Sequence, residues 1–250
     1  MTQSYIAFDC EFAWRADWHA AHLSMDLSSQ RRSISVKEVI SIAAYAYTID
    51  ADGALCIDAL ASWTQHDWGG EAEVVEQFID FVRRRPDHIA LGYGSIATDL
   101  PILRLAAMTA GLRLPNQLID QPGKWDRKHL DLALAIKGRG RTWVHLSQLL
   151  IRLGVPLALL ASKAEAPLPE SAEDWSAMRD HVELDTLLLA LAHTSWLVTV
   201  GTPGVRYASS AIGHLSAFVR RRPDHALADE IRRFQGQLEA DLASMYRDAA

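Results

Sequence analysis

Two carboxylates interrupt an otherwise apolar, strand-like stretch near the amino terminus, Y5-I-A-F-D-C-E-F-A-W14. Because successive strand side chains alternate between faces, Asp9 and Glu11 project from the same face, roughly 7 Å apart. Like charges on a buried face repel each other and resist removal from water. Either the strand end is solvated, or the carboxylates hold a divalent cation such as Mg²⁺, which prefers oxygen ligands. The pair alone favours solvation, so a metal site requires further acids in similar settings.

The composition is that of an ordinary globular protein. The chain has 250 residues, 49% of them hydrophobic and 22% charged, enough for one sizeable domain with a substantial core. No run approaches the ~20 apolar residues of a membrane span, and the first residues do not resemble a secretory signal. Cys10 and Cys56 give no disulfide framework, so we expect a reducing, cytoplasmic setting. The net charge of −6 excludes a uniformly basic nucleic-acid coat but permits local basic patches.

The order of the predicted elements indicates an α/β protein. Three strands come first, the last two of them an antiparallel pair joined by the turn at 50–53, and alternating helices and a strand follow. This order implies a mixed sheet flanked by helices. The polar stretch 15–37 is expected to be a long loop. We predict strands at 5–14, 39–49, 54–63 and 88–93, and helices at 71–83, 99–110, 130–136, 145–153, 175–192 and 226–246.

A boundary is predicted at G201-T-P-G204, which separates a domain at 1–200 from a C-terminal helical extension at 201–250. The last helix is amphipathic and must dock on the body or on a second copy of the chain, so it is a candidate for homo-oligomer contact. The octapeptide FVRRRPDH occurs at 81–88 and again at 218–225. Each copy is expected to end a helix with cations and a proline, which is favoured over a phosphate-binding role.

Further acids lie in settings like that of the first two. Asp99 follows a strand and a small-residue loop and opens a helix, where an N-capping aspartate is also common. His181 and Asp185 are four residues apart, so they face the same side of one helix. They are either a surface pair or part of a site, and the leucines at 187–189 favour a helix packed into the body.

Three segments resemble, in order, the motifs of DEDD-type 3′–5′ exonucleases: F8-D-C-E-F12, G92-Y-G-S-I-A-T-D-L-P-I-L103 and D180-H-V-E-L-D-T186. The segments 128–132 and 144–156 are similar to predicted exonucleases related to the proofreading domain of family B DNA polymerases. The resemblance covers roughly residues 5–195. It implies a ribonuclease H-like mixed β-sheet flanked by helices, with the C-terminal helical extension added to it.

The resemblance also implies a catalytic centre. Asp9, Glu11, Asp99 and Asp185 would hold two divalent ions, Mg²⁺ or in its place Mn²⁺. Two such ions about 4 Å apart activate a water, stabilise the pentacoordinate phosphorus and neutralise the leaving oxygen. His181 would orient or deprotonate the attacking water.

Some positions depart from the family pattern. Gly94 stands where the family often has asparagine, and Thr98 replaces an aromatic residue, which puts contacts with the terminal nucleotide in question. His181 has the spacing from the last acid that tyrosine has in the family, which leads to the hypothesis of a general base acting from the tyrosine position. Asp131 is a candidate either for supporting the metal ligands or for capping a helix.

Retention of all four acids favours an active nuclease over a degenerate fold that only binds nucleic acid. The expected substrate is a single-stranded or frayed 3′ end. The polymerase-like segments favour DNA, although D-C-E-F also resembles the first motif of RNA-trimming exoribonucleases. A small-molecule metal hydrolase has no feature in its favour. The run K137-G-R-G-R141 followed by Trp143 would grip the substrate through Arg139, Arg141 and the indole, or would be a solvated loop.

Overall fold

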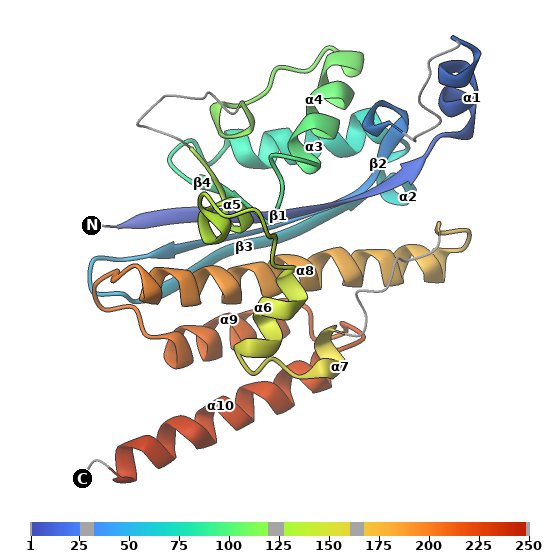
Figure 1. Ribbon diagram of the computed structural model, residues 1–250. Coiled ribbons are helices and arrows are strands. Elements are labelled where there is room, and N and C mark those ends of the chain that lie inside the picture. The colour runs from blue at the N-terminus through green and yellow to red at the C-terminus, as the bar shows by residue number, and fades with distance from the viewer. Residues whose placement is uncertain (1, 26–32, 120–127, 161–167, 249–250) are drawn as a thin grey trace.

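The protein folds around one five-stranded mixed sheet with the strand order β3-β2-β1-β4-β5 (Figure 1). The computed structural model describes residues 2–25, 33–119, 128–160 and 168–248. Strands β1, β2 and β3 form an antiparallel meander, and β4 and β5 continue the sheet parallel to β1. This arrangement confirms the predicted α/β class with a ribonuclease H-like sheet. The strands are β1 Gln3–Trp14, β2 Lys37–Ile49, β3 Leu55–Thr64, β4 Ile89–Gly92 and β5 His129–Asp131.

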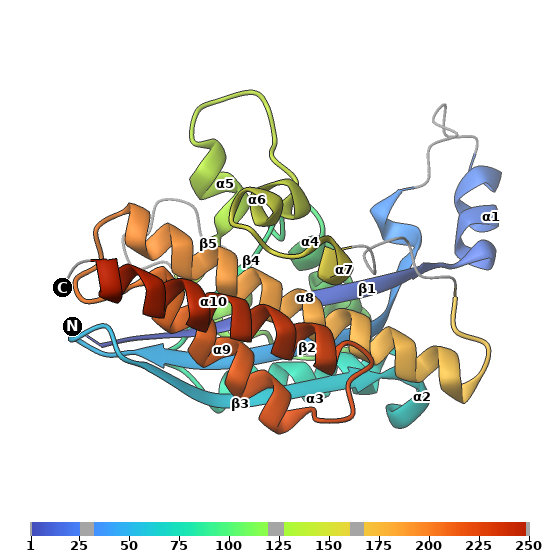
Figure 2. The ribbon, with the colours of Figure 1, turned by 90° about the horizontal axis from the view of Figure 1, so that it is seen from below.

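Helices cover both faces of the sheet. Helices α3 and α4 lie on one face, and α8 and α9 lie on the other, with α10 packed outside α9 (Figures 1 and 2). Two short 3₁₀ turns, η1 Ile34–Val36 and η2 Asn116–Leu118, complete the described elements. The helices are α1 Ala16–Ser24, α2 Gln65–Trp68, α3 Glu71–Arg83, α4 Asp99–Ala110, α5 Leu132–Lys137, α6 Leu146–Arg152, α7 Leu157–Leu160, α8 Ala172–Thr199, α9 Tyr207–Arg221 and α10 Ala228–Asp248.

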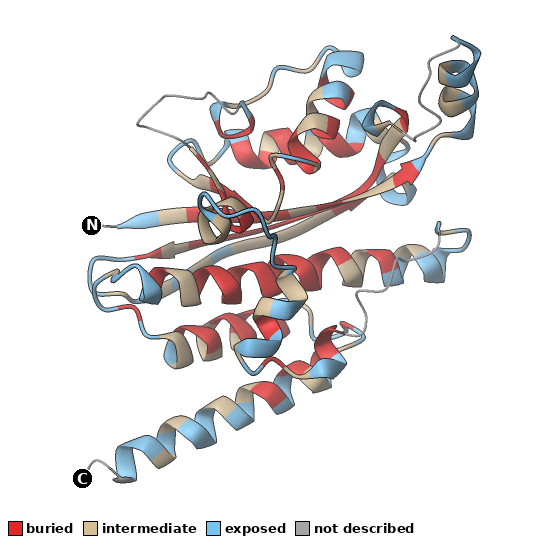
Figure 3. Cartoon of the chain, viewed as in Figure 1, coloured by how far each residue is buried: buried red, intermediate tan, exposed pale blue. Residues whose placement is uncertain are grey.

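The alternation of β1 side chains divides the core into two layers. Ile6, Phe8 and Cys10 pack toward α3 and α4, whereas Tyr5 and Ala7 pack toward α8 and α9. The middle of α8 is buried on all sides because this helix lies between the sheet and α9 (Figure 3). That position explains why the run at 187–192 is apolar around the whole circumference instead of along one stripe.

The residues on either side of the predicted boundary at 201–204 share one core. Side chains from α9 and α10, such as Phe218 and Phe234, belong to the same buried cluster as the strand and α8 residues. The connection itself touches the β2–β3 turn: a Cβ on Gly204 would lie 2.0 Å from the backbone oxygen of Asp52. Both Gly204 and Gly53 have positive φ angles, 76° and 83°. Only glycine fits such a close approach in this conformation without strain.

Two of the differences from the sequence prediction have a clear physical cause. Helix α1 lies within the stretch expected to be a loop; none of its residues is buried, so it has no apolar stripe to reveal it. Strand β5 occupies the start of the helix expected at 130–136, and α5 begins only at Leu132. A strand of three residues is too short to show a period and exists because it pairs with β4. No helix among the described residues is long and apolar enough to cross a membrane.

Candidate metal centre

The first two acids project from β1 toward α8. Asp9 and Glu11 continue the face of Tyr5 and Ala7, which packs against α8, and both are half-buried. Glu11 lies opposite Ser41 of β2, and the pairing register shifts immediately after it, between Glu11 and Phe12. Such a bulge bends a strand and redirects its side chains. The acids therefore lie where β1 begins to curve away from the centre of the sheet.

Helix α8 brings an imidazole and a third carboxylate to this strand. His181 Nε2 lies 3.1 Å from Glu11 Oε1 and 3.9 Å from Asp185 Oδ2. The four-residue spacing places both helix side chains on the same face, as predicted. One ligand atom from each of Glu11, His181 and Asp185 falls within 4.8 Å of the others. Side chains 170 residues apart in sequence thus form a compact group that can hold a cation.

Asp99 is close enough to Glu11 to feel its charge, but it is not one of the three residues whose ligand atoms meet. It is the first residue of α4, and β4, which leads to it, runs parallel to β1 with Leu91 opposite Ala7. The pKa of Asp99 is raised to about 7: burial is the largest cause and the negative charges of Glu11 and Asp131 add to it, whereas a backbone hydrogen bond and Lys37 lower it. The pKa of the Cys10 thiol is also raised, by burial and then by Asp99, Asp9 and Glu11. The charges of Asp9, Glu11 and Asp99 therefore all reach the same thiol, that of Cys10.

Asp131 fixes the loop that presents Asp99. Its carboxylate accepts hydrogen bonds from the backbone N–H groups of Gly94 at 2.9 Å and Ile96 at 3.0 Å. It also caps α5 by accepting from the N–H of Leu134 at 3.1 Å. Capping and support of the β4–α4 loop are thus combined in one residue. Gly94 has a φ of 72°, which favours glycine at the turn where the family often has asparagine.

The predicted substrate-binding residues lie on the exposed loop after α5. Arg139 and Arg141 are exposed, and Trp143 is 43% exposed. Lys137 Nζ lies 4.1 Å from the centroid of the Trp143 ring, a cation–π contact. The Tyr93 hydroxyl donates to the backbone oxygen of Val144, which anchors this loop to the β4–α4 segment. The loop is open to solvent and tied to the segment that carries Asp99.

Sequence reasoning missed Lys37, the first residue of β2. Its Nζ lies 4.9 Å from the ring centroid of Trp14 and 5.4 Å from that of Phe12. It is the cation that lowers the pKa of Asp99. Lys37 stood at the end of a stretch expected to be a loop, and its position beside β1 depends on strand pairing that the local sequence does not reveal.

The donor set suits a divalent cation. The oxygens come from carboxylates, which hard cations prefer, and the single nitrogen is an imidazole, which transition metals accept. The pKa of Asp99 is raised mainly by burial and also by the charge of Glu11, and a bound cation would offset both effects. Among the described residues, the ligand atoms that meet belong to Glu11, His181 and Asp185; the predicted acids Asp9 and Asp99 are not part of that group.

Comparison with known proteins supports the fold. No family model matches the chain, and no curated protein matches it. Among solved structures, the family B DNA polymerase from the hyperthermophilic archaeon Pyrobaculum calidifontis is similar over 88% of this chain, with a TM-score of 0.51 and 17% sequence identity. The chain spans 29% of that polymerase chain. The similarity therefore concerns the fold, and at this identity it does not transfer an activity.

Proposed function

We propose that the protein is a metal-dependent exonuclease that removes nucleotides from the 3′ end of nucleic acid. The observation that carries the proposal is the meeting of Glu11, His181 and Asp185 within 4.8 Å, next to the buried carboxylate of Asp99. Acids gathered from a strand and two helices cost stability unless they hold cations. The fold shared with a DNA polymerase supports nucleic acid as the substrate class.

In this mechanism Asp9, Glu11, Asp99 and Asp185 would hold two divalent ions, Mg²⁺ or Mn²⁺. When bound, such ions would supply Lewis-acid chemistry that favours ionisation of water and offsets charge on the phosphate and the leaving oxygen. Asp99 must lose its proton to bind a cation, because its raised pKa leaves it partly protonated near pH 7. His181 accepts a proton at Nε2, since imidazole does so near neutral pH and this atom borders the acids.

The exposed loop after α5 binds the strand. Arg139 and Arg141 contact phosphates, and Trp143 offers a face on which a base can stack. The preferred substrate is DNA with a single-stranded or frayed 3′ end, which fits the polymerase fold; RNA trimming is the alternative. Sugar discrimination depends on contacts with the 2′-hydroxyl.

The test is cleavage of 5′-labelled and 3′-labelled DNA and RNA oligonucleotides with Mg²⁺, with Mn²⁺ and with chelator. We expect stepwise shortening of the 5′-labelled strand, early loss of the 3′ label, and no reaction in chelator. Asp185→Asn is the matched control, because it preserves shape and removes one charge. Full activity in chelator, or equal activity of Asp185→Asn, would overturn the proposal. Binding without cleavage would assign the chain to the nucleic-acid-binding class.

A further inference from the structure

The two identical octapeptides make different contacts. Both end a helix, the first copy α3 and the second α9. In the first copy, Arg85 stays with its own helix: its guanidinium carbon lies 3.8 Å from the Phe81 ring centroid, and it donates to the Phe81 backbone oxygen. The equivalent residue of the second copy, Arg222, leaves its helix and reaches α8. Since the local sequence is the same, the difference arises from what each copy faces.

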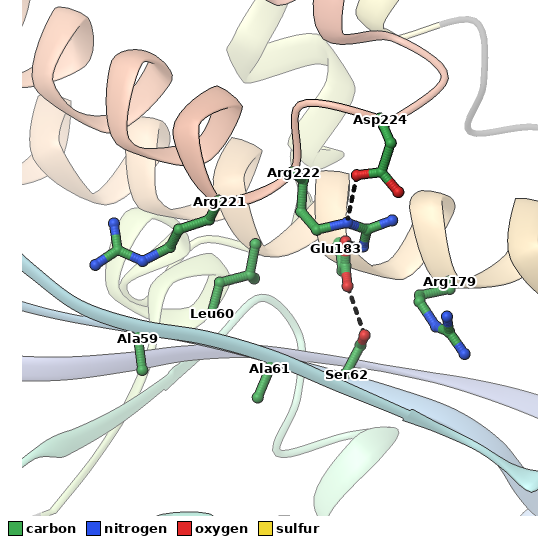
Figure 4. A pocket seen from close by; sticks show the side chains of 9 residues that line it. All are labelled: Ala59, Leu60, Ala61, Ser62, Arg179, Glu183, Arg221, Arg222 and Asp224. Carbon is green, nitrogen blue, oxygen red and sulfur yellow. Dashed lines mark hydrogen bonds and ion pairs between the residues drawn. The ribbon is translucent and has the colours of Figure 1, made fainter. Parts of the chain in front are cut away.

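Arg222 bridges two carboxylates of α8. One of its terminal nitrogens donates to Glu183, and the other donates to Asp180 Oδ1 at 2.9 Å. Figure 4 shows Arg222 beside Glu183. The same turn adds two contacts to Asp180: the backbone N–H of Ala226 donates to Oδ2, and His225 Nε2 lies 2.9 Å from the backbone oxygen. The C-terminal segment thus holds one turn of α8 through side-chain and backbone contacts together.

That turn is the one that carries His181. Asp180 precedes His181, and Glu183 follows it by two residues, about 200° around the helix. Glu183 is only 2% exposed and also accepts a hydrogen bond from Ser62 of β3. One side of α8 therefore meets the metal centre, and the opposite side is held by β3 and Arg222. A buried carboxylate needs such a partner, because leaving its charge unpaired is strongly unfavourable.

Neither of the neighbouring arginines is engaged with Glu183. A pocket of about 520 Å³ lies beside the pair, with Arg179 and Arg221 among its lining residues. Arg179 pairs with Asp67, and Arg221 donates to a backbone oxygen of β3 at 2.7 Å. Figure 4 shows both side chains directed away from Glu183.

We propose that Arg222 is a positioning residue for the metal centre: it fixes the rotation of α8 so that His181 and Asp185 face Glu11. This inference rests on the proposed function. At a side-chain radius of about 5 to 6 Å, a helix rotation of about 10° moves a side-chain tip by about 1 Å. A misplacement of that size can lower an enzymatic rate by about 100-fold. The C-terminal extension is therefore part of the catalytic unit.

The test compares Arg222→Gln/Glu183→Gln with Arg85→Gln. The double variant removes both charges of the buried pair, so no carboxylate is left alone at position 183. The single variant changes the equivalent arginine of the other octapeptide copy and is the matched control. The primary readout is the imidazole resonances of His181 in the metal-free protein, assigned by their absence from His181→Tyr. Circular dichroism verifies folding. If the double variant unfolds, Arg222→Lys is used, because lysine keeps the charge but lacks the planar fork.

We expect the chemical shifts of the His181 imidazole to change in the Arg222 variant, whether Arg222→Gln/Glu183→Gln or Arg222→Lys. They should be unchanged in Arg85→Gln. The kcat for oligonucleotide cleavage should fall about 10- to 100-fold with KM little changed, as for residues that orient metal ligands. A folded Arg222 variant with unmoved His181 resonances would overturn the inference. The two proposals can fail separately. If the wild-type protein has no nuclease activity, the proposed function is wrong. The His181 resonances of the metal-free protein still show whether Arg222 positions α8.

Discussion

Replacing Asp99 by asparagine should stabilise the metal-free protein at alkaline pH. Burial, and then the charge of Glu11, raise the pKa of Asp99 from 3.8 to about 7. Since one pKa unit corresponds to about 1.36 kcal/mol, ionising this group costs at most about 4 kcal/mol more in the folded protein than in the unfolded chain. Asparagine has a similar shape and no charge, so the variant avoids this cost.

The sign of the pH dependence follows from which state binds the proton of Asp99 more tightly. Between about pH 4 and pH 7 the folded protein holds a proton that the unfolded chain has released. The free energy of unfolding of the wild type therefore falls as the pH rises through this window. The stability gained by Asp99→Asn should be small near pH 4 and reach its maximum, up to about 4 kcal/mol, near pH 8.

Urea unfolding in chelator at several pH values measures this difference. Asp87→Asn, which changes an exposed acid of the first octapeptide, is the control and should leave the pH dependence unchanged. Adding Mn²⁺ should narrow the difference: a ligand at 100 times its Kd stabilises the wild type by about 2.7 kcal/mol, and Asp99→Asn should gain less. A variant whose stability relative to wild type is the same near pH 4 and pH 8 would refute the reasoning.

Three further changes separate the functional from the structural parts of the account. Replacing Arg139 and Arg141 together by glutamine should raise KM and flatten its dependence on salt, since fewer phosphate contacts release fewer counterions; an unchanged salt slope would make the segment a solvated loop. His181→Ala should lower kcat by about 100-fold or more while His181→Tyr keeps appreciable activity, and a near-wild-type kcat in the alanine variant with metal affinity intact would leave water activation to the metals alone. Gly204→Ala should lower the melting temperature clearly more than Gly111→Ala, because both glycines have positive φ but only at Gly204 would a Cβ meet backbone, at 2.0 Å; equal losses would mean that the contact is easily relieved.

Much of the fold follows from patterns that are local in the sequence. Helices α3 and α4 begin and end where their apolar stripe, acidic first turn and glycine or arginine ends predict. The alternation in β1 assigns Asp9 and Glu11 to one face before any partner strand is known. The four-residue spacing does the same for His181 on α8. Each of these signals arises within one element, so the sequence alone carries it.

What escaped prediction depends on contacts between distant segments. Lys37 acts on Asp99 only because β2 pairs with β1, and β5 exists only because β4 lies beside it. Arg222 and Arg85 have the same neighbours in sequence, yet only one of them reaches α8. No local pattern distinguishes the two copies. The inference that the C-terminal extension positions α8 through Arg222 therefore required the structure.

The most direct test of the central claim is to identify the first product released from single-stranded DNA in the presence of Mn²⁺. Mass spectrometry of a single-turnover reaction should find a mononucleotide with a 5′-phosphate, in equal amount to a strand one residue shorter with a free 3′-hydroxyl. This result follows if water attacks the last phosphodiester and the 3′ oxygen leaves. Internal fragments, a nucleotide taken from the 5′ end, or an intact strand under these conditions would contradict the account.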